Sequence, residues 1–247
     1  MHKRSNMFWT IYKKLEKDVI DLSYYIHFSD EENENKCNQI WAYSNQIADL
    51  LTAVSIQIES LFLELYKLEF KAIPKSIGTS INEIEKKWTL STKQVSIICK
   101  NMYFIDINGF GSAFAPMSYK SQDKNDYYSA YCAVKHNRVD ALHKANINVL
   151  LRALAALFIL NVYYSFEKVE VSEISEFDFS LGSDVFLLTF STNSYSSSDV
   201  IIVEEDKEYL KKISDYADAL PDLDSGEYLK FVDENNSPKR FTVKLNK

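Results

Sequence analysis

The feature that most constrains the fold is an apolar run of 18 residues, "INVLLRALAALFILNVYY", at 147–164. A helix of this length is long enough to cross a bilayer. Arg152 lies inside the run, however, and a central arginine makes an isolated membrane span costly. We therefore expect 147–164 to be a buried core helix.

Two earlier segments have the spacing of amphipathic helices. Apolar residues recur at steps of three and four in 6–27 and again in 39–70, where the pattern from Ile47 to Leu68 has no gap. Such a seam predicts a helix with one face turned to the core.

The last long helix is expected at about 126–165, where it includes the apolar run. The stretch "SQDKNDYY" precedes it and offers Ser121, Asp123 and Asn125 as N-cap residues. With the two earlier helices, it would complete a helical bundle.

Strand-like sequence appears in two places. A β-prone stretch from Lys93, followed by Gly109 and Gly111, predicts a β-hairpin or small sheet inserted at about 90–117. After residue 166, apolar and serine-rich segments predict several strands, a short helix ending before Pro221 and a final hairpin. The expected fold class is α+β and mainly α: a helical bundle over 1–165 with the inserted hairpin, and a β-rich region, 166–247, packed on it.

Composition limits the partners and the compartment. The net charge is −7 over 247 residues, so the chain lacks the basic footprint of a general nucleic-acid binder. Three widely spaced cysteines without a Cys-x-x-Cys pair argue against a disulfide framework or a thiolate zinc site. The N-terminus lacks the uninterrupted apolar stretch of a signal peptide. We expect a cytoplasmic protein without a membrane partner.

The stretch "KHNRVDALHKAN", 135–146, is the main candidate for a functional site. On a continuous helix, Arg138 would fall on the apolar face and would need a carboxylate, because an unpaired buried guanidinium is costly. Glu59, beside the seam of the second helix, is the expected partner. In a purely structural interpretation, this salt bridge is the only role of Arg138.

The alternative interpretation is catalytic. Cleavage of RNA through its 2′-hydroxyl needs a group that moves protons near neutral pH, for which histidine is suited, and a cation for the phosphate, for which arginine is suited. The candidates are Arg138 with His143 or His136, oriented by Glu59.

Substrate contacts are expected from neighbouring residues. They are Lys135, Asn137 and Tyr131, the last as a ring on which bases stack. At helical spacing, a tyrosine such as Tyr131 is more often a core residue.

No metal or cofactor is expected. His136 and His143 are seven residues apart, roughly 10 Å along a helix, which is long for two ligands of one ion. The sequence also contains no glycine-rich phosphate loop and no His-Glu-x-x-His motif.

The hexapeptide Arg138-Val-Asp-Ala-Leu-His143 resembles the Arg-x4-His signature of the HEPN superfamily. Many HEPN proteins are metal-independent ribonucleases of prokaryotic defence and toxin systems, built as helical bundles that dimerise to bring two motifs together. The segments "YSNQIADLLTAVSIQIESLFLELY" and "YCAVKHNRVDALHKANINVLLRALAALFILNVYY" also resemble uncharacterised bacterial HEPN- or Abi-like proteins. The resemblance covers the bundle, not the C-terminal third.

Two functions follow as hypotheses. The first is a homodimeric, metal-independent RNA endonuclease in a defence or toxin context. The second is a non-catalytic interaction module of a defence complex, which binds a partner protein through its C-terminal region. Val139 favours the second, because catalytic members often have a polar residue after the arginine.

Overall fold

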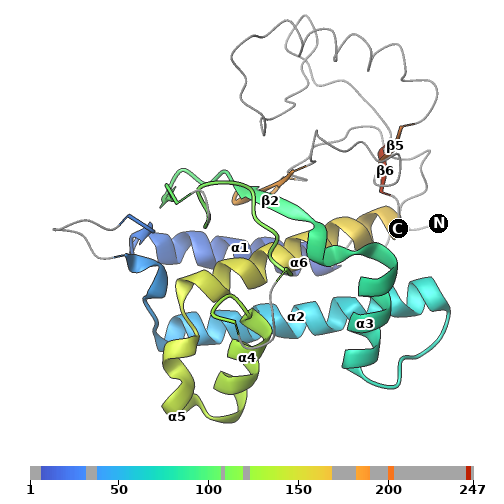
Figure 1. The fold of residues 1–247 in the computed structure, drawn as a ribbon, viewed down its shortest axis with the longest axis horizontal. Helices are drawn as coiled ribbons and strands as arrows, with labels where there is room; N and C mark the ends of the chain where they lie inside the picture. Colours follow the sequence, from blue (N-terminus) through green and yellow to red (C-terminus); the bar gives the residue numbers. More distant parts are fainter. Residues whose placement is uncertain are drawn as a thin grey trace, which may run out of the picture.

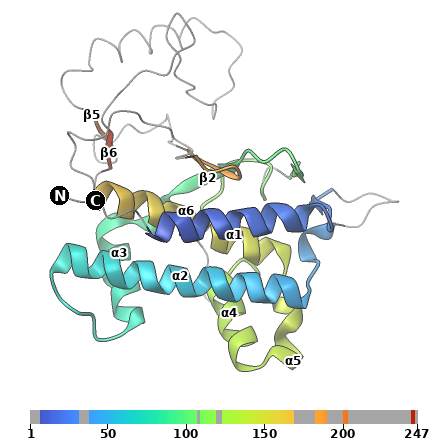
Figure 2. The ribbon, with the colours of Figure 1, turned by 180° about the vertical axis from the view of Figure 1, so that it is seen from behind.

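The chain folds around one buried helix, α6 (Ile147–Lys168). The computed structural model describes residues 7–31, 38–106, 109–118, 123–168, 182–189, 200–202 and 243–245. The helices α1 (Met7–Ser23) and α2 (Asn45–Phe70) lie along α6, as Figures 1 and 2 show. The described part is mainly helical, as the sequence predicts.

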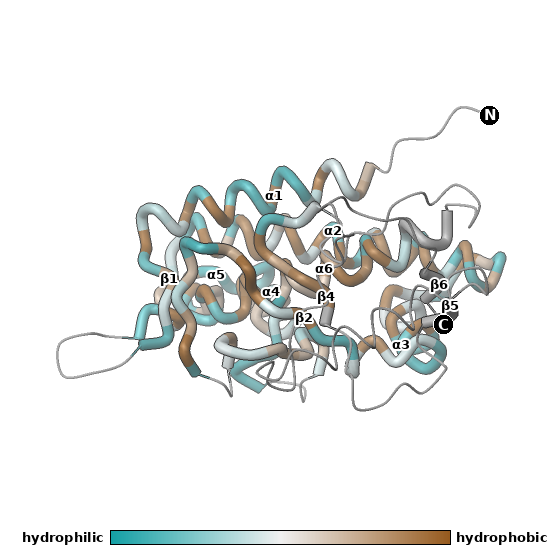
Figure 3. The backbone as a smooth tube through the Cα atoms, turned by 90° about the horizontal axis from the view of Figure 1, so that it is seen from above, coloured by the Kyte–Doolittle hydropathy of each residue, from teal (hydrophilic) through white to brown (hydrophobic). Residues whose placement is uncertain are grey.

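The two amphipathic helices form where the periodicity places them. Ser44 caps α2 by accepting a hydrogen bond from the Ile47 N–H at 3.2 Å, and the short helix η1 (Gln39–Trp41) precedes it. Both helices pack against α6 through their buried residues, and Figure 3 shows hydrophobic and hydrophilic residues alternating along α1. The predictions for 6–27 and 39–70 are confirmed.

Helix α6 has apolar residues on all its faces, since other parts of the protein pack around it. Among the described residues, α2 and α6 are long and apolar enough to span a membrane by length and composition, but the 18-residue stretch of α6 is wholly buried inside the protein. Arg152 is buried too, with its guanidinium over the rings of Phe110 and Phe114 and its Nε donating to Asn148 Oδ1 at 3.1 Å. Burial lowers the pKa of Arg152 to about 10, although the charge of Asp123 opposes the shift.

A third helix, α3 (Ile77–Trp88), packs against α2. Ser76 accepts a hydrogen bond from the Thr79 N–H and begins the helix, and the short η2 (Leu90–Thr92) follows it. The Trp88 ring stacks on Tyr163 of α6 with 5.0 Å between centroids, so this end of the bundle is closed by aromatic packing.

The strands do not form the predicted local hairpin. Strand β2 (Gln94–Ile97) pairs antiparallel with β4 (Phe186–Thr189), while β3 (Met102–Tyr103) pairs parallel with β1 (Phe28–Ser29). Within the described part of 90–117, the prediction is met in part by an antiparallel bridge between Val95 and Phe114, whose backbone N–H groups donate to each other's carbonyls at 3.0 and 2.9 Å. The strands β2 and β3 themselves pair with strands far away in the sequence. As a result, the pair β2–β4 joins the bundle to the C-terminal region.

The predicted β-rich C-terminal region is largely outside the described residues. Its described strands are β4 and the antiparallel pair β5 (Val200–Ile202) and β6 (Val243–Leu245). The predicted strands at 169–181, the helix before Pro221 and the first strand of the final hairpin lie outside the described residues.

The predicted continuous helix at 126–165 is broken. It consists of α4 (Tyr127–His136), α5 (Arg138–Ala141), the short η3 (Leu142–Lys144) and α6. The capping residue is Asp126, whose Oδ1 accepts from the Ser129 N–H at 2.9 Å, and not Ser121, Asp123 or Asn125. In Figures 1 and 2, α4 and α5 project beyond α2.

Candidate functional site

Two asparagines shape the projecting corner between α4 and α6. The backbone of Asn137 leaves the helical region (φ −149°, ψ 70°), and its Nδ2 donates to Asp140 Oδ2 at 2.8 Å. At the other end, Asn146 Oδ1 accepts from the Val149 N–H at 3.2 Å, the arrangement of a helix cap. Asparagine competes with the helix for such bonds, so the chain turns outward between these residues. We call residues 135–146 together with Asp49 the Arg138 corner.

The guanidinium of Arg138 is exposed and pairs with Asp49, not with Glu59. Its Nη2 donates to Asp49 Oδ1, and the two side chains are 42% and 69% exposed. Glu59 instead accepts the Tyr128 hydroxyl at 3.0 Å and lies about 15 Å further along α2 at 1.5 Å per residue. The predictions of an inward Arg138 and of a bridge to Glu59 are wrong, because the helix break rotates Arg138 out of the core.

Both candidate histidines lie in the corner and are exposed. His136 is the last residue of α4, and His143 lies in η3, five residues after Arg138. Neither imidazole has a hydrogen bond or ion pair within the described residues. Both rings are therefore open to solvent and accessible to a bound molecule.

The three residues predicted to contact substrate differ in their exposure. Asn137 and Lys135 are exposed, and the Lys135 ammonium donates to the Tyr131 hydroxyl at 3.1 Å. This hydrogen bond raises the pKa of Lys135, which keeps the side chain cationic. Tyr131 itself is only 1% exposed, so the prediction that bases stack on its ring is wrong. Its ring belongs to the core.

Glu59 belongs to the α2–α4 contact and not to the corner. Burial, and then its hydrogen bond to Glu59, raises the pKa of the Tyr128 phenol. Burial and the charge of Glu59 likewise raise the pKa of the Cys132 thiol, so both groups stay protonated at neutral pH. Glu59 thus ties two helices together, and we assign it no part in orienting Arg138.

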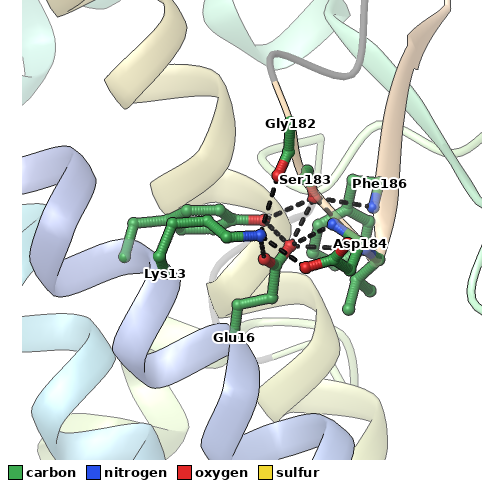
Figure 4. A network of polar contacts seen from close by, with 8 residues as sticks. Lys13, Glu16, Gly182, Ser183, Asp184 and Phe186 are labelled. Carbon is green, nitrogen blue, oxygen red and sulfur yellow. Dashed lines mark hydrogen bonds and ion pairs between the residues drawn. The ribbon is translucent and has the colours of Figure 1, made fainter.

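A second polar cluster, which the sequence patterns did not indicate, surrounds a buried acid of α1. Glu16 of α1 is 0% exposed, and its Oε1 accepts from Ser183 Oγ at 2.5 Å, from the Tyr12 hydroxyl at 2.7 Å and from the Asp184 N–H at 3.0 Å (Figure 4). Lys13 donates to Glu16 Oε2, and also to the Gly182 carbonyl at 2.7 Å and to Asp184 Oδ2 at 2.6 Å. We call this cluster the Glu16 junction.

The Glu16 junction is closed and has a structural role. Ser183 Oγ also accepts from the Phe186 N–H at 2.9 Å, so the segment leading into β4 is fixed to α1 (Figure 4). Burial and the neighbouring charge of Glu16 raise the pKa of the Tyr12 phenol well above its usual value. The pKa of Lys13 is raised as well: burial acts to lower it, but hydrogen bonds to Asp184 and Glu16 outweigh this effect. The signal in the sequence was an acid at helical spacing among apolar residues of α1, from Tyr12 to Val19.

The Arg138 corner is therefore the candidate functional site. Within the described residues, no group of three or more His, Cys, Asp or Glu side chains is placed to hold a metal ion. Comparisons with protein-family models, with curated proteins and with solved structures found no match. The functional argument thus depends on the chemistry that the corner itself offers.

Proposed function

We propose that the Arg138 corner is the active site of a metal-independent RNA endonuclease, which acts as a cytoplasmic homodimer in a prokaryotic defence or toxin system. One observation carries the proposal: an exposed guanidinium, held by a single contact to Asp49, shares a corner with two exposed imidazoles that have no partner within the described residues. The resemblance of Arg138–His143 to the HEPN signature agrees with this assignment.

The groups of the corner match the needs of cleavage through the 2′-hydroxyl. The 2′-oxygen attacks the adjacent phosphorus and the P–O5′ bond breaks, which leaves a 2′,3′-cyclic phosphate and a 5′-hydroxyl. A neutral imidazole, His143 or His136, takes the proton of the 2′-hydroxyl, and a protonated imidazole gives a proton to the departing 5′-oxygen. Arg138 stabilises the charge on the non-bridging oxygens, because its planar fork matches phosphate geometry.

Asp49 takes the orienting role that the sequence suggested for Glu59. Its carboxylate holds one nitrogen of the guanidinium, and the remaining N–H groups of Arg138 have no acceptor within the described residues. These free donors are the ones that would bind the phosphate. The exposed Lys135 and Lys144 flank the site and add positive charge.

Val139 favours contact with another protein at the corner. It is an apolar side chain with 92% of its surface exposed, directly after Arg138. In the nuclease proposal it contacts a second copy of the chain and brings two corners together. It equally favours the second candidate function, a non-catalytic module in which the corner binds a different protein.

The experiment that separates the two candidates is RNA cleavage in the presence of EDTA. Purified protein is incubated with end-labelled single-stranded RNA, beside Arg138→Ala and His143→Ala variants. The proposal predicts chelator-resistant cleavage that leaves 2′,3′-cyclic phosphates, falls at least 100-fold in both variants and is absent on a 2′-deoxy strand. Absence of cleavage, or cleavage that both variants retain, supports the interaction module.

Matched controls come from the chain itself. Lys67→Ala removes an exposed cation that pairs with Glu64 at 2.7 Å near the other end of α2, and His27→Ala removes an exposed imidazole stacked on Tyr103. Both should cleave like the unmodified protein. His136→Ala then tests whether the second imidazole also takes part in proton transfer.

A further inference from the structure

Two exposed aromatic residues lie next to the Arg138 corner. Trp41 ends η1 and Tyr43 follows two residues later, and their side chains are 40% and 55% exposed. Ala42, between them, has extended backbone angles (φ −60°, ψ 137°). One extended residue between them keeps the Cα atoms of Trp41 and Tyr43 roughly 7 Å apart at most, so both side chains start from the same short segment.

The backbone places these rings beside the catalytic candidates. Tyr43 forms an antiparallel bridge with Asn146, and the Ile147 N–H donates to the Ala42 carbonyl at 3.1 Å. His143 lies three residues before Asn146. Six residues after Tyr43, Asp49 holds Arg138. The segments 41–49 and 138–147 are therefore joined at both ends, with the aromatic pair at one end and the guanidinium at the other.

One cation lies against the first of these rings, and a second is close in the sequence to the corner. The Lys124 ammonium lies over the Trp41 ring, 5.4 Å from its centroid, and Lys144 is exposed directly after His143. Lys124 is itself exposed, and its backbone carbonyl accepts from Asn148 Nδ2 at 3.1 Å, which fixes this residue against α6. Aromatic faces interleaved with lysines are the surface that binds single-stranded nucleic acid, because bases stack on rings while phosphates meet the cations.

We propose that Trp41 and Tyr43 form the base-stacking platform for a single-stranded RNA substrate whose phosphate lies at Arg138. This inference rests on the proposed nuclease function and names the substrate class: unpaired RNA, bound by its bases on one side of the scissile phosphate. A duplex does not fit, because its base faces are stacked on one another. The platform replaces Tyr131, whose ring is buried.

The chain supplies a matched control for this surface. Phe70 is a partly exposed aromatic residue at the other end of α2, and the Lys87 ammonium lies 5.8 Å from its ring centroid. It repeats the local chemistry of Trp41 and Lys124 but lies roughly 40 Å away along a 26-residue helix. If RNA bound to any exposed ring with a lysine beside it, replacing Phe70 would weaken binding as much as replacing Trp41.

The test measures binding without cleavage. The probe is a fluorescein-labelled 2′-O-methyl RNA of about 12 nucleotides, which lacks the attacking hydroxyl, and the readout is fluorescence anisotropy with the full chain. We expect Trp41→Ala and Tyr43→Ala to raise Kd by about 5-fold to 150-fold each, which corresponds to about 1–3 kcal/mol per stacked base. Tyr43→Phe and Phe70→Ala should leave Kd within about 2-fold, and a duplex of the same sequence should bind equally to all variants.

The outcomes separate this inference from the proposed function. An unchanged Kd in Trp41→Ala and Tyr43→Ala overturns the platform, even where cleavage depends on Arg138 and His143. A raised Kd in both variants, with no cleavage of ordinary RNA, supports the platform and contradicts the nuclease. Absence of binding by the unmodified chain, or equal losses for Phe70→Ala, also overturns the platform.

Discussion

The Glu16 junction and the Arg138 corner are built from the same kinds of groups but differ in access to water. In the junction, Lys13 meets a carboxylate that is fully buried and also accepts hydrogen bonds from two hydroxyls and the backbone. In the corner, Arg138 meets the exposed carboxylate of Asp49 through one nitrogen. Buried charges are costly unless fully paired, whereas exposed pairs are weak and exchange partners readily.

The difference teaches where a protein can use a charged group for binding. A saturated buried network resists change, so it holds the strand pair β2–β4 to the bundle through Ser183 and Phe186. An exposed cation with free N–H donors costs the fold little free energy, and it can bind an anion. The two regions should therefore respond in opposite ways to mutation: stability changes at the junction, and function changes at the corner.

The largest effect on stability is expected at Glu16. Glu16→Ala leaves the hydroxyls of Tyr12 and Ser183 and the Asp184 N–H without their acceptor, and it should lower the free energy of unfolding by about 3–5 kcal/mol. Glu16→Gln keeps an acceptor oxygen and should cost about half as much. Urea unfolding followed by circular dichroism measures both. If Glu16→Ala lowered the free energy of unfolding by less than about 1 kcal/mol, the junction would be no more important for stability than an exposed ion pair, and the contrast with the corner would be wrong.

Removing Ser183 should have a smaller and more local effect. Ser183→Ala takes away the acceptor of the Phe186 N–H and a donor to Glu16, a loss of about 1–3 kcal/mol. Hydrogen exchange of the Phe186 amide should become faster, while the amides of α6 remain protected. Ser60→Ala, on the outer side of α2, is the control and should change neither quantity. Unchanged exchange at Phe186 would contradict the assigned anchoring role.

The junction also predicts a dependence of stability on alkaline pH. Unfolded Tyr12 and Lys13 titrate near pH 10 to 10.4, and folding raises both pKa values, so the folded chain holds these protons more tightly. Their contribution to stability is complete below about pH 10 and is lost as the pH rises through the folded values. Tyr12→Phe should reduce the slope of stability against pH above about pH 10, by at most about 1.4 kcal/mol per pH unit. Tyr25→Phe, at an exposed tyrosine, is the control; an equal change of slope in both variants would contradict the assignment.

The smallest effect on stability is expected at Asp49. Asp49→Asn breaks the exposed ion pair with Arg138 and should change the free energy of unfolding by less than about 1 kcal/mol. In the nuclease proposal, the same variant loosens Arg138 and lowers the cleavage rate. A large loss of stability would show that the corner is structural after all.

The sequence predicted those parts of the fold that depend on local periodicity. Helices α1 and α2 follow from apolar spacing, and α6 follows from its apolar run, because a helix covered on every side needs no polar face. Strand pairing was not predictable in this way. Strand β2 pairs with β4, about 90 residues further on, and the local sequence of either strand does not indicate which strand it pairs with.

The candidate site was predicted in its composition but not in its geometry. Arg138, His136 and His143 do lie in one corner, yet the break at Asn137 depends on a side-chain bond to Asp140 that apolar spacing does not reveal. That break turned Arg138 outward, and its acid became Asp49 instead of Glu59. Trp41 and Tyr43 were missed because their place beside the corner arises only from the contact of Tyr43 with Asn146.

The central claim is that the Arg138 corner serves catalysis and not stability. The most direct test measures the cleavage rate in EDTA and the free energy of unfolding of Arg138→Ala in one preparation, beside the unmodified chain. The account predicts a rate at least 100-fold lower with a stability change below about 1 kcal/mol. An unchanged rate, or a loss of stability of several kcal/mol, would contradict it.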